Sequence, residues 1–330
     1  MILIISDKKD LHADQVEAKL IDQGLPYYRF NLDVYSLLQT SYLFHLGDFQ
    51  IIQDERLLEI KNVSCVWSRR TCATLLESEA WIEPADFGLW RNEWDKTLDA
   101  IFYRLRKLPW LNPLEAANAA QNKYLQMQSA TESGFSIPET LISNNRAALL
   151  RFQQLAGPVT LRFLDHGFYG LAENAAKMAY VNKLTESNLA KFTGINENPI
   201  VLQRYIERAY QVRYTIVDRA HFACRIDSRL SRVANIDWGK YDLPNAPQRI
   251  IHVRESLRAK MNHLMNTMGL IYGSVNFIVD KNNKWFFLGI NPMGDFLELD
   301  IRMEEKISRA TAEWLYYNLN AKHKYSQSMN

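Results

Sequence analysis

Two apolar segments around residue 280 have the pattern of a β-hairpin. Ser274–Val279 and Trp285–Ile290 are rich in β-branched and aromatic residues, and the polar run Asp280–Asn283 between them is typical of a turn. Asparagine tolerates positive φ, so we expect the turn to centre on Asn282-Asn283. That register predicts three cross-strand pairs: Lys281 with Lys284, Asn276 with Gly289, and Ser274 with Asn291.

The register places positions 276, 289 and 291 on one face, because side chains alternate along a strand. Three oxygen ligands on one face of a hairpin can hold Mg²⁺ against the phosphates of a nucleotide. Here two of the ligands are neutral amides, Asn276 and Asn291, and the third position is Gly289. The pattern therefore indicates a metal site that has lost its carboxylates.

Two cations elsewhere in the sequence suit phosphate groups. Lys123 follows Asn122 in a helical segment, where a lysine reaches phosphates as a point charge; the alternative is an ordinary solvated helix lysine. Arg162 lies in the apolar strand Val159–Phe163, where a cation needs a partner, and a structural ion pair is an equally good account. Farther along, the strand Ile200–Ile206 turns polar, and the backbone groups after Gln203 suit the edge of an adenine ring, although many core strands end this way.

The segment 203–232 is rich in arginine and has no lysine. Arginine side chains match carboxylates and phosphates, so an acidic peptide or a triphosphate is the implied ligand; the alternative is a mixed-charge sheet face. The dipeptide Arg69-Arg70 is a second candidate anion contact, after a strand that ends at Trp67. The arginines of the segment are Arg204, Arg208, Arg213, Arg219, Arg225, Arg229 and Arg232, and its acids are Glu207, Asp218 and Asp227.

Strands and helices of the right length to position these residues can be read along the whole sequence. The strands expected are Ile2–Ile5, Tyr27–Phe30, Ser41–Leu46, Phe49–Gln53, Arg56–Ile60, Val63–Trp67, Glu139–Ser143, Val159–Phe163, Ile200–Ile206, Gln211–Val217 and His221–Ile226. The helices expected are His12–Gln23, Asp86–Leu105, Arg146–Leu155, Leu184–Phe192, Val253–Met268 and Glu304–Leu319. A further helix should begin with Asn112 as its N-cap and Pro113 as its first residue, and run to about Ser133. The pattern predicts an α/β (α+β) protein of several lobes.

Composition excludes several classes of function. The formal net charge of the 330 residues is +2, which gives no global field for nucleic acid or an anionic membrane. No apolar run approaches the roughly 20 residues that span a bilayer, and no signal peptide precedes the first strand, so we expect a soluble cytoplasmic protein. The three cysteines are dispersed, and no Walker loop, dinucleotide fingerprint or nucleophile elbow is present.

Taken in order, these segments resemble the ATP-grasp peptide ligases of the microviridin type, the graspetide omega-ester ligases. The resemblance covers nearly the whole chain, and the order and spacing of its motifs carry it. The matching segments are Val66–Arg70, Asn92–Trp94, Trp110–Pro113, Asn122-Lys123, Ser136–Ile142, Gln203–Ile206, Val212–Val217, Phe222–Ser228, Asp237-Trp238 and Phe287–Gly294.

The resemblance implies an ATP-grasp fold with an N-terminal α/β lobe at 1–112, a central subdomain at 113–195 and a C-terminal subdomain at 196–330 that includes a peptide-binding hairpin. Such ligases use ATP and Mg²⁺ to activate a carboxylate as an acyl phosphate, which a hydroxyl or amine then attacks. The implied partner is a ribosomally made precursor peptide, and a partner ligase and a homodimer are left open.

The resemblance also implies roles for individual residues. Lys123 and Arg162 would hold ATP phosphates, with Arg162 in the place of an expected lysine, and Arg213 would meet the γ-phosphate as a catalytic residue beside Arg162. The adenine hinge would consist of Gln203, Arg204, Tyr205 and Ile206. The peptide would be bound by Arg213, Arg219, Arg225 and Asp227, and its leader segment would be clasped against the hairpin 215–226.

The departures from the family pattern fall on the metal. The family pattern has Asp at Asn276 and Glu at Gly289, so only Asn291 is retained, and Gln211 stands where an acid is expected. Asp295, Glu298 and Asp300 follow the hairpin as candidate substitutes. Two interpretations remain: a peptide-binding pseudoligase with impaired or lost ligation, or an active ligase that forms ester or amide crosslinks with a rearranged metal site.

Overall fold

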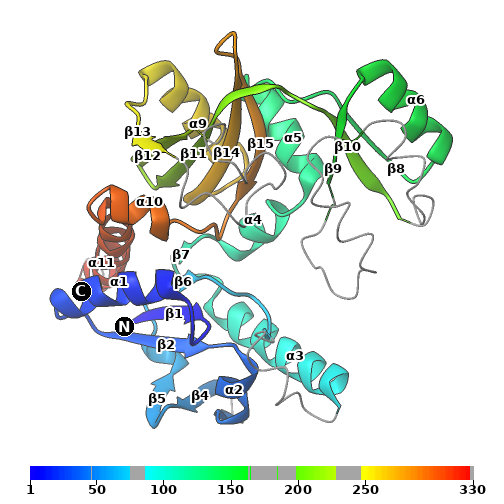
Figure 1. The fold of residues 1–330 in the computed structure, drawn as a ribbon. Coiled ribbons are helices and arrows are strands. Elements are labelled where there is room, and N and C mark those ends of the chain that lie inside the picture. Colours follow the sequence, from blue (N-terminus) through cyan, green and yellow to red (C-terminus); the bar gives the residue numbers. More distant parts are fainter. Residues whose placement is uncertain are drawn as a thin grey trace.

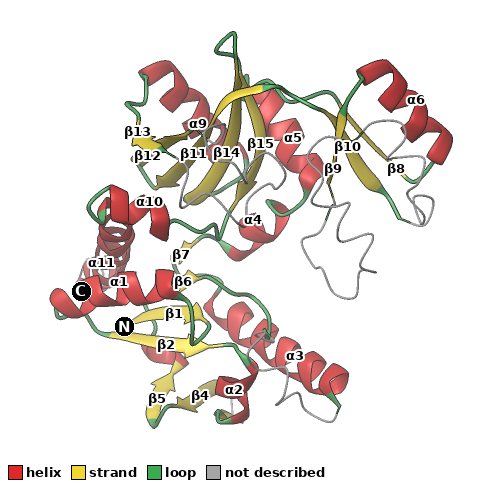
Figure 2. Cartoon of the chain, in the orientation of Figure 1, coloured by secondary structure: helices red, strands yellow, loops and turns green. Residues whose placement is uncertain are grey.

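The computed structural model describes residues 1–45, 47–74, 86–162, 164, 184, 198–227 and 247–327, the last seven by their backbone alone. Figure 1 shows three lobes, each built around a sheet, with the N-terminal lobe at the bottom and the other two side by side above it. Figure 2 shows both helices and strands in each of the three, which confirms the predicted α/β class. The predicted helix Leu184–Phe192 and Arg229 and Arg232 lie outside the described residues, except for Leu184 itself.

The N-terminal lobe is built on a parallel sheet that is covered on both faces. Its elements are β1 (Ile2–Ser6), α1 (Leu11–Asp22), β2 (Tyr27–Asn31), α2 (Val34–Leu38), β3 (Ser41–His45), β4 (Asp48–Gln53), β5 (Arg56–Glu59), the 3-10 turn η1 (Ile60–Asn62), β6 (Cys65–Ser68), α3 (Phe87–Leu105) and β7 (Trp110–Leu111). The strand order is β2-β1-β6-β7, and β3-β4-β5 form a separate antiparallel sheet. Ile2 and Ile4 pack toward α1, whereas Leu3 and Ile5 pack toward α3, so β1 is apolar on both faces.

In the residues that the structure describes, the central lobe is a small antiparallel sheet covered by one helix. Its elements are β8 (Thr140–Ser143), α6 (Arg146–Ala156), β9 (Val159–Arg162) and β10 (Ile200–Arg204), in the strand order β8-β10-β9. Leu149 of α6 packs on Leu161 and Leu202 of the sheet. Asn145 caps α6 by accepting from the amide of Ala148, so the lobe begins its helix with a local signal that the sequence contains.

The C-terminal lobe carries the predicted hairpin on a five-stranded antiparallel sheet. Its elements are β11 (Arg208–Val217), β12 (Ala220–Ile226), β13 (Gln248–Ile250), α9 (Glu255–Thr267), β14 (Tyr272–Asp280), β15 (Trp285–Asn291), α10 (Leu297–Arg302) and α11 (Lys306–Gln327). The strand order is β13-β12-β11-β14-β15. Tyr214, Phe277 and Phe287 cover one face and pack against Leu264 of α9. The other face of the same strands carries the polar residues of the candidate site.

The single helix expected from Pro113 to about Ser133 is wrong. The chain forms α4 (Leu114–Ala119), then turns, and begins again as α5 (Lys123–Glu132). Asn122 interrupts the helix because its side chain caps α5, accepting from the amide of Tyr124 at 2.9 Å. Asn122 is a residue type that often caps helices, but it lies within a pattern that predicts one continuous helix, so the break between α4 and α5 was not predicted.

Asn112 is not the N-cap that the sequence predicted; it joins two lobes. Its side-chain nitrogen donates to the carbonyls of Tyr272 and Pro292 at 2.8 and 2.7 Å. Its side-chain oxygen accepts from the amides of Tyr272 and Ile271 at 2.6 and 2.7 Å. The buried side chain of Asn112 therefore bonds the backbone at the base of the hairpin instead of capping the helix that follows it.

Two helices pack on a lobe other than the one to which the predicted boundaries assign them. α5 packs on the C-terminal sheet through Ala130, and Ile307, Ala312 and Leu315 of α11 pack on the N-terminal sheet beside α1. The boundaries 1–112, 113–195 and 196–330 stay a prediction, to which the packing adds that β10 is the middle strand of the central sheet. In the described part of the chain, no helix is both long and apolar enough to cross a membrane.

Candidate functional site

The hairpin of β14 and β15 brings the candidate ligand positions together. Asn276 pairs with Gly289, and Ser274 pairs with Asn291, which confirms the predicted register. Asn276 and Asn291 are exposed, although the residues on either side of Asn276 in this central strand are buried. An exposed amide in the middle of an otherwise buried strand marks the face on which a ligand has access.

The turn that produces this register differs from the predicted one. The amide of Asp280 donates to the carbonyl of Lys284 at 3.1 Å, so the loop is three residues long and the expected pairing of Lys281 with Lys284 is wrong. Asn283 supplies the left-handed conformation, with a φ of 61°. The longer loop shifts the pairing of the two strands by one residue. A bulge at Leu288 adds one residue to β15 and shifts the pairing back, so Asn276 has its predicted partner.

Arg213, Asn276 and Gly289 form a row across three strands. Arg213 of β11 is the register partner of Asn276, and Asn276 is that of Gly289. The amide oxygen of Asn291 already accepts from the backbone of Met293 at 2.9 Å. In the described residues, no group of three or more His, Cys, Asp or Glu side chains is placed to hold a metal ion. The residues of the predicted metal site, Asn276, Gly289 and Asn291, therefore offer Mg²⁺ two neutral amide oxygens and no side-chain carboxylate.

The three acids that follow the hairpin are engaged elsewhere. The Asp295 carboxylate lies 3.2 Å from both His12 and Arg69 of the N-terminal lobe. Glu298 accepts from the side chain of Gln248 at 2.5 Å. Asp300 is fully buried and accepts from the amides that begin α11, at 2.7 and 3.0 Å. Each of the three acids therefore already has a protein partner in this structure.

Lys123 reaches the bulge because Gln126 fixes α5 against β15. Gln126 is buried, donates to the carbonyl of Ile290 at 2.9 Å, and accepts from the amide of Ile290 at 3.2 Å. Lys123 lies three residues earlier on the same side of the helix. A Cβ atom built on Gly289 would lie 3.9 Å from Lys123 Nζ and 3.1 Å from Gln126 Oε1. The lysine is thus next to the position where the family pattern has an acid.

Arg162 meets the same bulge from the central lobe. Its guanidinium donates to the carbonyl of Leu288 at 3.0 Å. Burial lowers the pKa of Arg162 to about 10, and burial followed by the charge of Arg162 lowers the pKa of Lys123. The structure therefore brings together the two cations that the sequence singled out, together with Gly289.

The segment Gln203–Ile206 continues from the middle strand of the central sheet. Gln203 is buried and donates to the hydroxyl of Thr140 at 3.0 Å. The amide of Arg204 donates to the carbonyl of Glu139 at 2.8 Å, and that of Tyr205 donates to the carbonyl of Pro158 at 2.9 Å. Two of the amides expected to meet an adenine ring are thus bonded within the lobe, and the adenine role of this segment stays a prediction.

The predicted peptide-binding residues do not form one group. Arg213 is half-buried in the row described above, and Arg219 is exposed in the turn between β11 and β12. Arg225 is the partner of Val212 on the opposite face, where it pairs with Asp227 at 2.6 Å and lies over the ring of Tyr210. Arg225 and Asp227 therefore satisfy each other, and their peptide-binding role stays a prediction.

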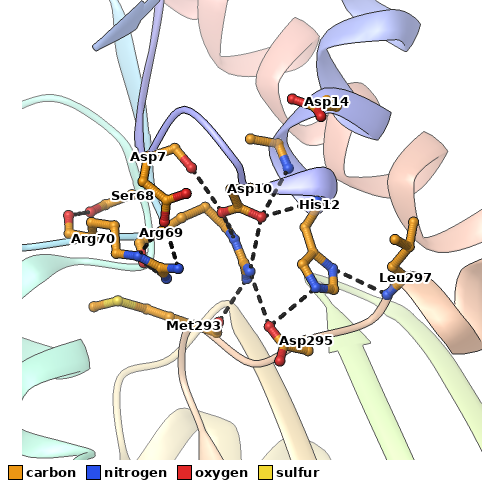
Figure 3. Close-up of polar contacts among 12 residues, drawn as sticks. Asp7, Asp10, His12, Asp14, Ser68, Arg69, Arg70, Met293, Asp295 and Leu297 are labelled. Atoms are coloured by element: carbon orange, nitrogen blue, oxygen red, sulfur yellow. Dashed lines mark hydrogen bonds and ion pairs between the residues drawn. The ribbon is translucent and has the colours of Figure 1, made fainter. Parts of the chain in front are cut away.

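A second polar cluster lies where β1 and β6 end (Figure 3). Arg69 is 2% exposed and its guanidinium binds the Asp10 carboxylate at 2.8 Å, the Asp295 carboxylate at 3.2 Å and the carbonyl of Met293 at 2.7 Å. Burial raises the pKa of Asp10, but the charge of Arg69 and hydrogen bonds from Arg69 and Ser6 outweigh it, so that the pKa falls to about 2. Arg69 is thus a structural ion-pair partner, not the free anion contact that the sequence left open.

His12 completes this cluster and ties α1 to the start of α10. Its Nδ1 accepts from the amides of Phe296 and Leu297 at 3.2 and 3.1 Å, and its Nε2 faces Asp295. With Nδ1 as the acceptor, the ring hydrogen is on Nε2 and is donated to Asp295. Sequence reasoning missed both residues because the partners of His12 lie 284 and 285 residues away and Arg69, the partner of Asp10, lies 59 residues away. The one available signal was Asp10 as the cap of α1.

An N-terminal α/β lobe, a central antiparallel lobe and a larger antiparallel lobe with a polar sheet face constitute the ATP-grasp fold. Residues 1–118 match the model of the MvdD pre-ATP-grasp domain. Among curated proteins, none is significantly similar to this chain.

Solved structures match the chain over nearly its full length. A RiPP-associated ATP-grasp ligase of Chryseobacterium gregarium, in complex with ADP and a leader and core peptide, is 25% identical with a TM-score of 0.80, and the match covers 95% of this chain and 96% of that one. Macrocyclase MdnC of Microcystis aeruginosa MRC, bound with precursor peptide MdnA, is 25% identical with a TM-score of 0.79, and the match covers 96% and 99%. Macrocyclase MdnB of the same organism shares the fold at 22% identity. These findings show that the chain has the ATP-grasp fold and is similar to ATP-grasp ligases associated with ribosomally made, post-translationally modified peptides (RiPPs).

Proposed function

We propose that this chain binds a precursor peptide in RiPP maturation and has lost Mg-ATP-dependent ligation. The observation that carries the proposal is the hairpin face, which presents Asn276, Gly289 and Asn291 where the family pattern places two acids and an asparagine. Mg²⁺ prefers charged carboxylates and gives up its water reluctantly. The absence of two of them should lower the rate of phosphoryl transfer by about three decades or more.

Peptide binding is supported by the parts of the molecule that remain intact. The similarity to two ligases that were solved with their peptides bound covers 95% and 96% of this chain. Arg213 presents a half-buried cation on the site face, and Arg219 presents an exposed one at the nearby turn. Guanidinium groups in such positions favour an acidic peptide. A partner ligase would then supply the chemistry, and a homodimer is the alternative assembly.

The second candidate is an active ligase that forms ester or amide crosslinks. In that reaction a peptide carboxylate attacks the γ-phosphorus of ATP and ADP leaves; a hydroxyl or amine then attacks the acyl carbon and phosphate leaves. Retention of Lys123 and Arg162 beside the hairpin favours it, because both would contact the transferred group.

ADP release separates the two functions. The protein would be mixed with ATP, Mg²⁺ and the acidic precursor peptide, and ADP would be measured over time, with peptide binding measured in parallel by calorimetry. Our proposal predicts peptide binding without stimulated ADP release. Peptide-stimulated, Mg²⁺-dependent ADP release would establish the active ligase.

Restoring the two acids tests whether their absence is the reason for the proposed loss of ligation. Asn276→Asp with Gly289→Glu should introduce Mg²⁺-dependent nucleotide affinity, and Asn282→Asp, which adds a charge at the exposed hairpin tip, should not. Because the Cβ at position 289 would lie close to Gln126, Asn276→Asp alone is the variant that adds a carboxylate with the least disturbance. If neither variant gains affinity in Mg²⁺, the loss of the acids does not explain the absence of turnover.

A further inference from the structure

The small antiparallel sheet of the N-terminal lobe ends in an apolar edge strand. β3 pairs with β4 along one side, and in the part of the chain that the structure describes no other strand pairs with its other side. Four of the five residues of β3 are exposed, among them Leu43 and Phe44, each at 55%. Figure 1 shows β4 and β5 at the lower end of this lobe, away from the other two lobes. The strand therefore faces solvent on the outside of the molecule.

The pairing of β3 with β4 sets which backbone groups of β3 point outward. Two residues separate the register partners His45 and Asp48, and the residues that flank such a two-residue loop form a hydrogen-bonded pair. Hydrogen-bonded and non-hydrogen-bonded pairs then alternate along the ladder. The backbone groups of Leu43 consequently point toward β4, and those of Tyr42 and Phe44 point away from it.

The second hairpin of the same sheet agrees with this assignment. Asp54 and Glu55 both have positive φ, 51° and 61°, as a type I′ turn of two residues requires. Gln53 and its partner Arg56 flank this turn, so the backbone groups of Gln53 point toward β5. Gln50, at the opposite parity in β4, therefore points toward β3, where it is the register partner of Leu43.

β3 also lacks the charged residues that keep the edges of natural sheets from pairing. The strand reads Ser-Tyr-Leu-Phe-His, without lysine, arginine, acid or proline. The opposite edge of the same sheet, β5, contains Arg56 and Glu59. Charged edge strands resist the addition of another strand, whereas long neutral ones accept it. The edge of β3 is thus suited to an uncharged partner strand.

We propose that β3 pairs with β3 of a second copy of this chain, antiparallel and centred on Leu43. The strand is self-complementary, because a two-fold axis at Leu43 is the register that pairs all five of its residues. In that register the outward backbone groups of Tyr42 and Phe44 face those of Phe44 and Tyr42 of the second copy. Two Phe44 rings and two Leu43 side chains lose contact with water, and no acid, lysine or arginine is buried.

The inference goes beyond the proposed function and does not depend on it. The interface contains none of the residues of the candidate site, so the same dimer is expected for a pseudoligase and for an active ligase. A strand supplied by a different protein is the competing occupant, and the purified chain would then be a monomer.

Cysteine crosslinking tests the register. In an antiparallel sheet, two residues that meet in a non-hydrogen-bonded pair have Cα atoms about 4.5 Å apart, which is within the range of a disulfide. Leu43→Cys should therefore form a covalent dimer when copper phenanthroline oxidises the thiols. Leu57→Cys is the matched control, because Leu57 is 52% exposed on the same face of the sheet but lies in β5. The native cysteines are the same in both variants. Equal crosslinking of the two variants, or none at Leu43→Cys, would overturn the proposal.

Sedimentation velocity tests the association without a crosslink. The unmodified chain should form a dimer whose fraction increases with concentration. Leu43→Lys places two like charges opposite each other on the axis and should raise the dissociation constant about tenfold or more. Leu57→Lys, which adds the same charge at the other edge, should leave it unchanged, and circular dichroism checks that both variants are folded. A chain that is monomeric at every concentration, or a dimer that Leu43→Lys does not weaken, would refute the pairing of β3 with its own copy.

Discussion

The molecule contains two clusters of charged side chains whose cations have different partners. Around Arg69, the carboxylates of Asp10 and Asp295 lie within 3.2 Å of the guanidinium (Figure 3). Around the bulge, Lys123 and Arg162 meet a glycine and backbone carbonyl oxygen. The acids of the first cluster stabilise its cation, whereas burial lowers the pKa of both cations in the second. The presence of an arginine in the sequence does not show which kind of cluster it belongs to, because that depends on the groups that surround it in the fold.

Removal of Arg69 should have the largest effect. Arg69→Met leaves the Asp10 carboxylate buried without its cation, and we expect the free energy of unfolding to fall by about 3–5 kcal/mol. Urea unfolding followed by tryptophan fluorescence measures this change. Lys96→Ala is the control, because its pair with Asp99 is exposed and should contribute about 0.5 kcal/mol or less. Equal effects of the two variants would show that the Arg69 cluster does not hold the lobes together.

The pH dependence of stability should report the charge of Asp10. Its pKa is about 2 in the folded chain against 3.8 for the unperturbed group, so its contribution is fully present above about pH 4 and is lost as the pH falls toward 2. The difference corresponds to about 2 kcal/mol. Asp10→Asn keeps an oxygen for capping α1 but removes the charge, and its unfolding free energy should lack this component between pH 4 and 2. An unchanged acid profile would contradict the assignment.

Asp295 should matter less than Asp10, although both bind Arg69. Its side chain is 77% exposed, so the ion pair is screened by water. We expect Asp295→Asn to lower the free energy of unfolding by about 1 kcal/mol or less in the same urea experiment. A loss as large as that of Arg69→Met would mean that the contact between the lobes, and not the buried pair, carries the stability.

Lys123 should give the smallest effect, with the opposite sign. Burial and the charge of Arg162 lower its pKa, so the folded state holds this cation unfavourably at neutral pH. Lys123→Met should leave the free energy of unfolding unchanged or raise it by up to about 1 kcal/mol in the absence of nucleotide. A decrease of 2 kcal/mol or more would place Lys123 among the structural cations and remove the contrast between the two clusters.

Local sequence signals were enough for most of the elements. The helices α1 and α6 and the strand β1 formed within one residue of their expected bounds. Asn112 was misread because its partners, Tyr272 and Pro292, are distant in the sequence and more numerous than a cap offers.

The candidate site was predictable only in part, for a similar reason. The pairing of Asn276 with Gly289 was correct because the longer turn and the bulge at Leu288 cancel, and a pattern of residue types reveals neither of them. Arg225 and Asp227 are two residues apart at the end of β12, but the sequence alone did not show that they would pair. His12 and Asp295 could not be associated because nothing local connects them.

The hydrogen bonds of Asn112 anchor the base of the hairpin. They hold Tyr272, the first residue of β14, and Pro292, just beyond β15, whereas Lys281–Lys284 at the far end are exposed. Rigidity should therefore decrease along the hairpin from its base to its tip. The row of Arg213, Asn276 and Gly289 lies in the anchored half, so the geometry that meets an incoming ligand is set by the N-terminal lobe as much as by the sheet itself.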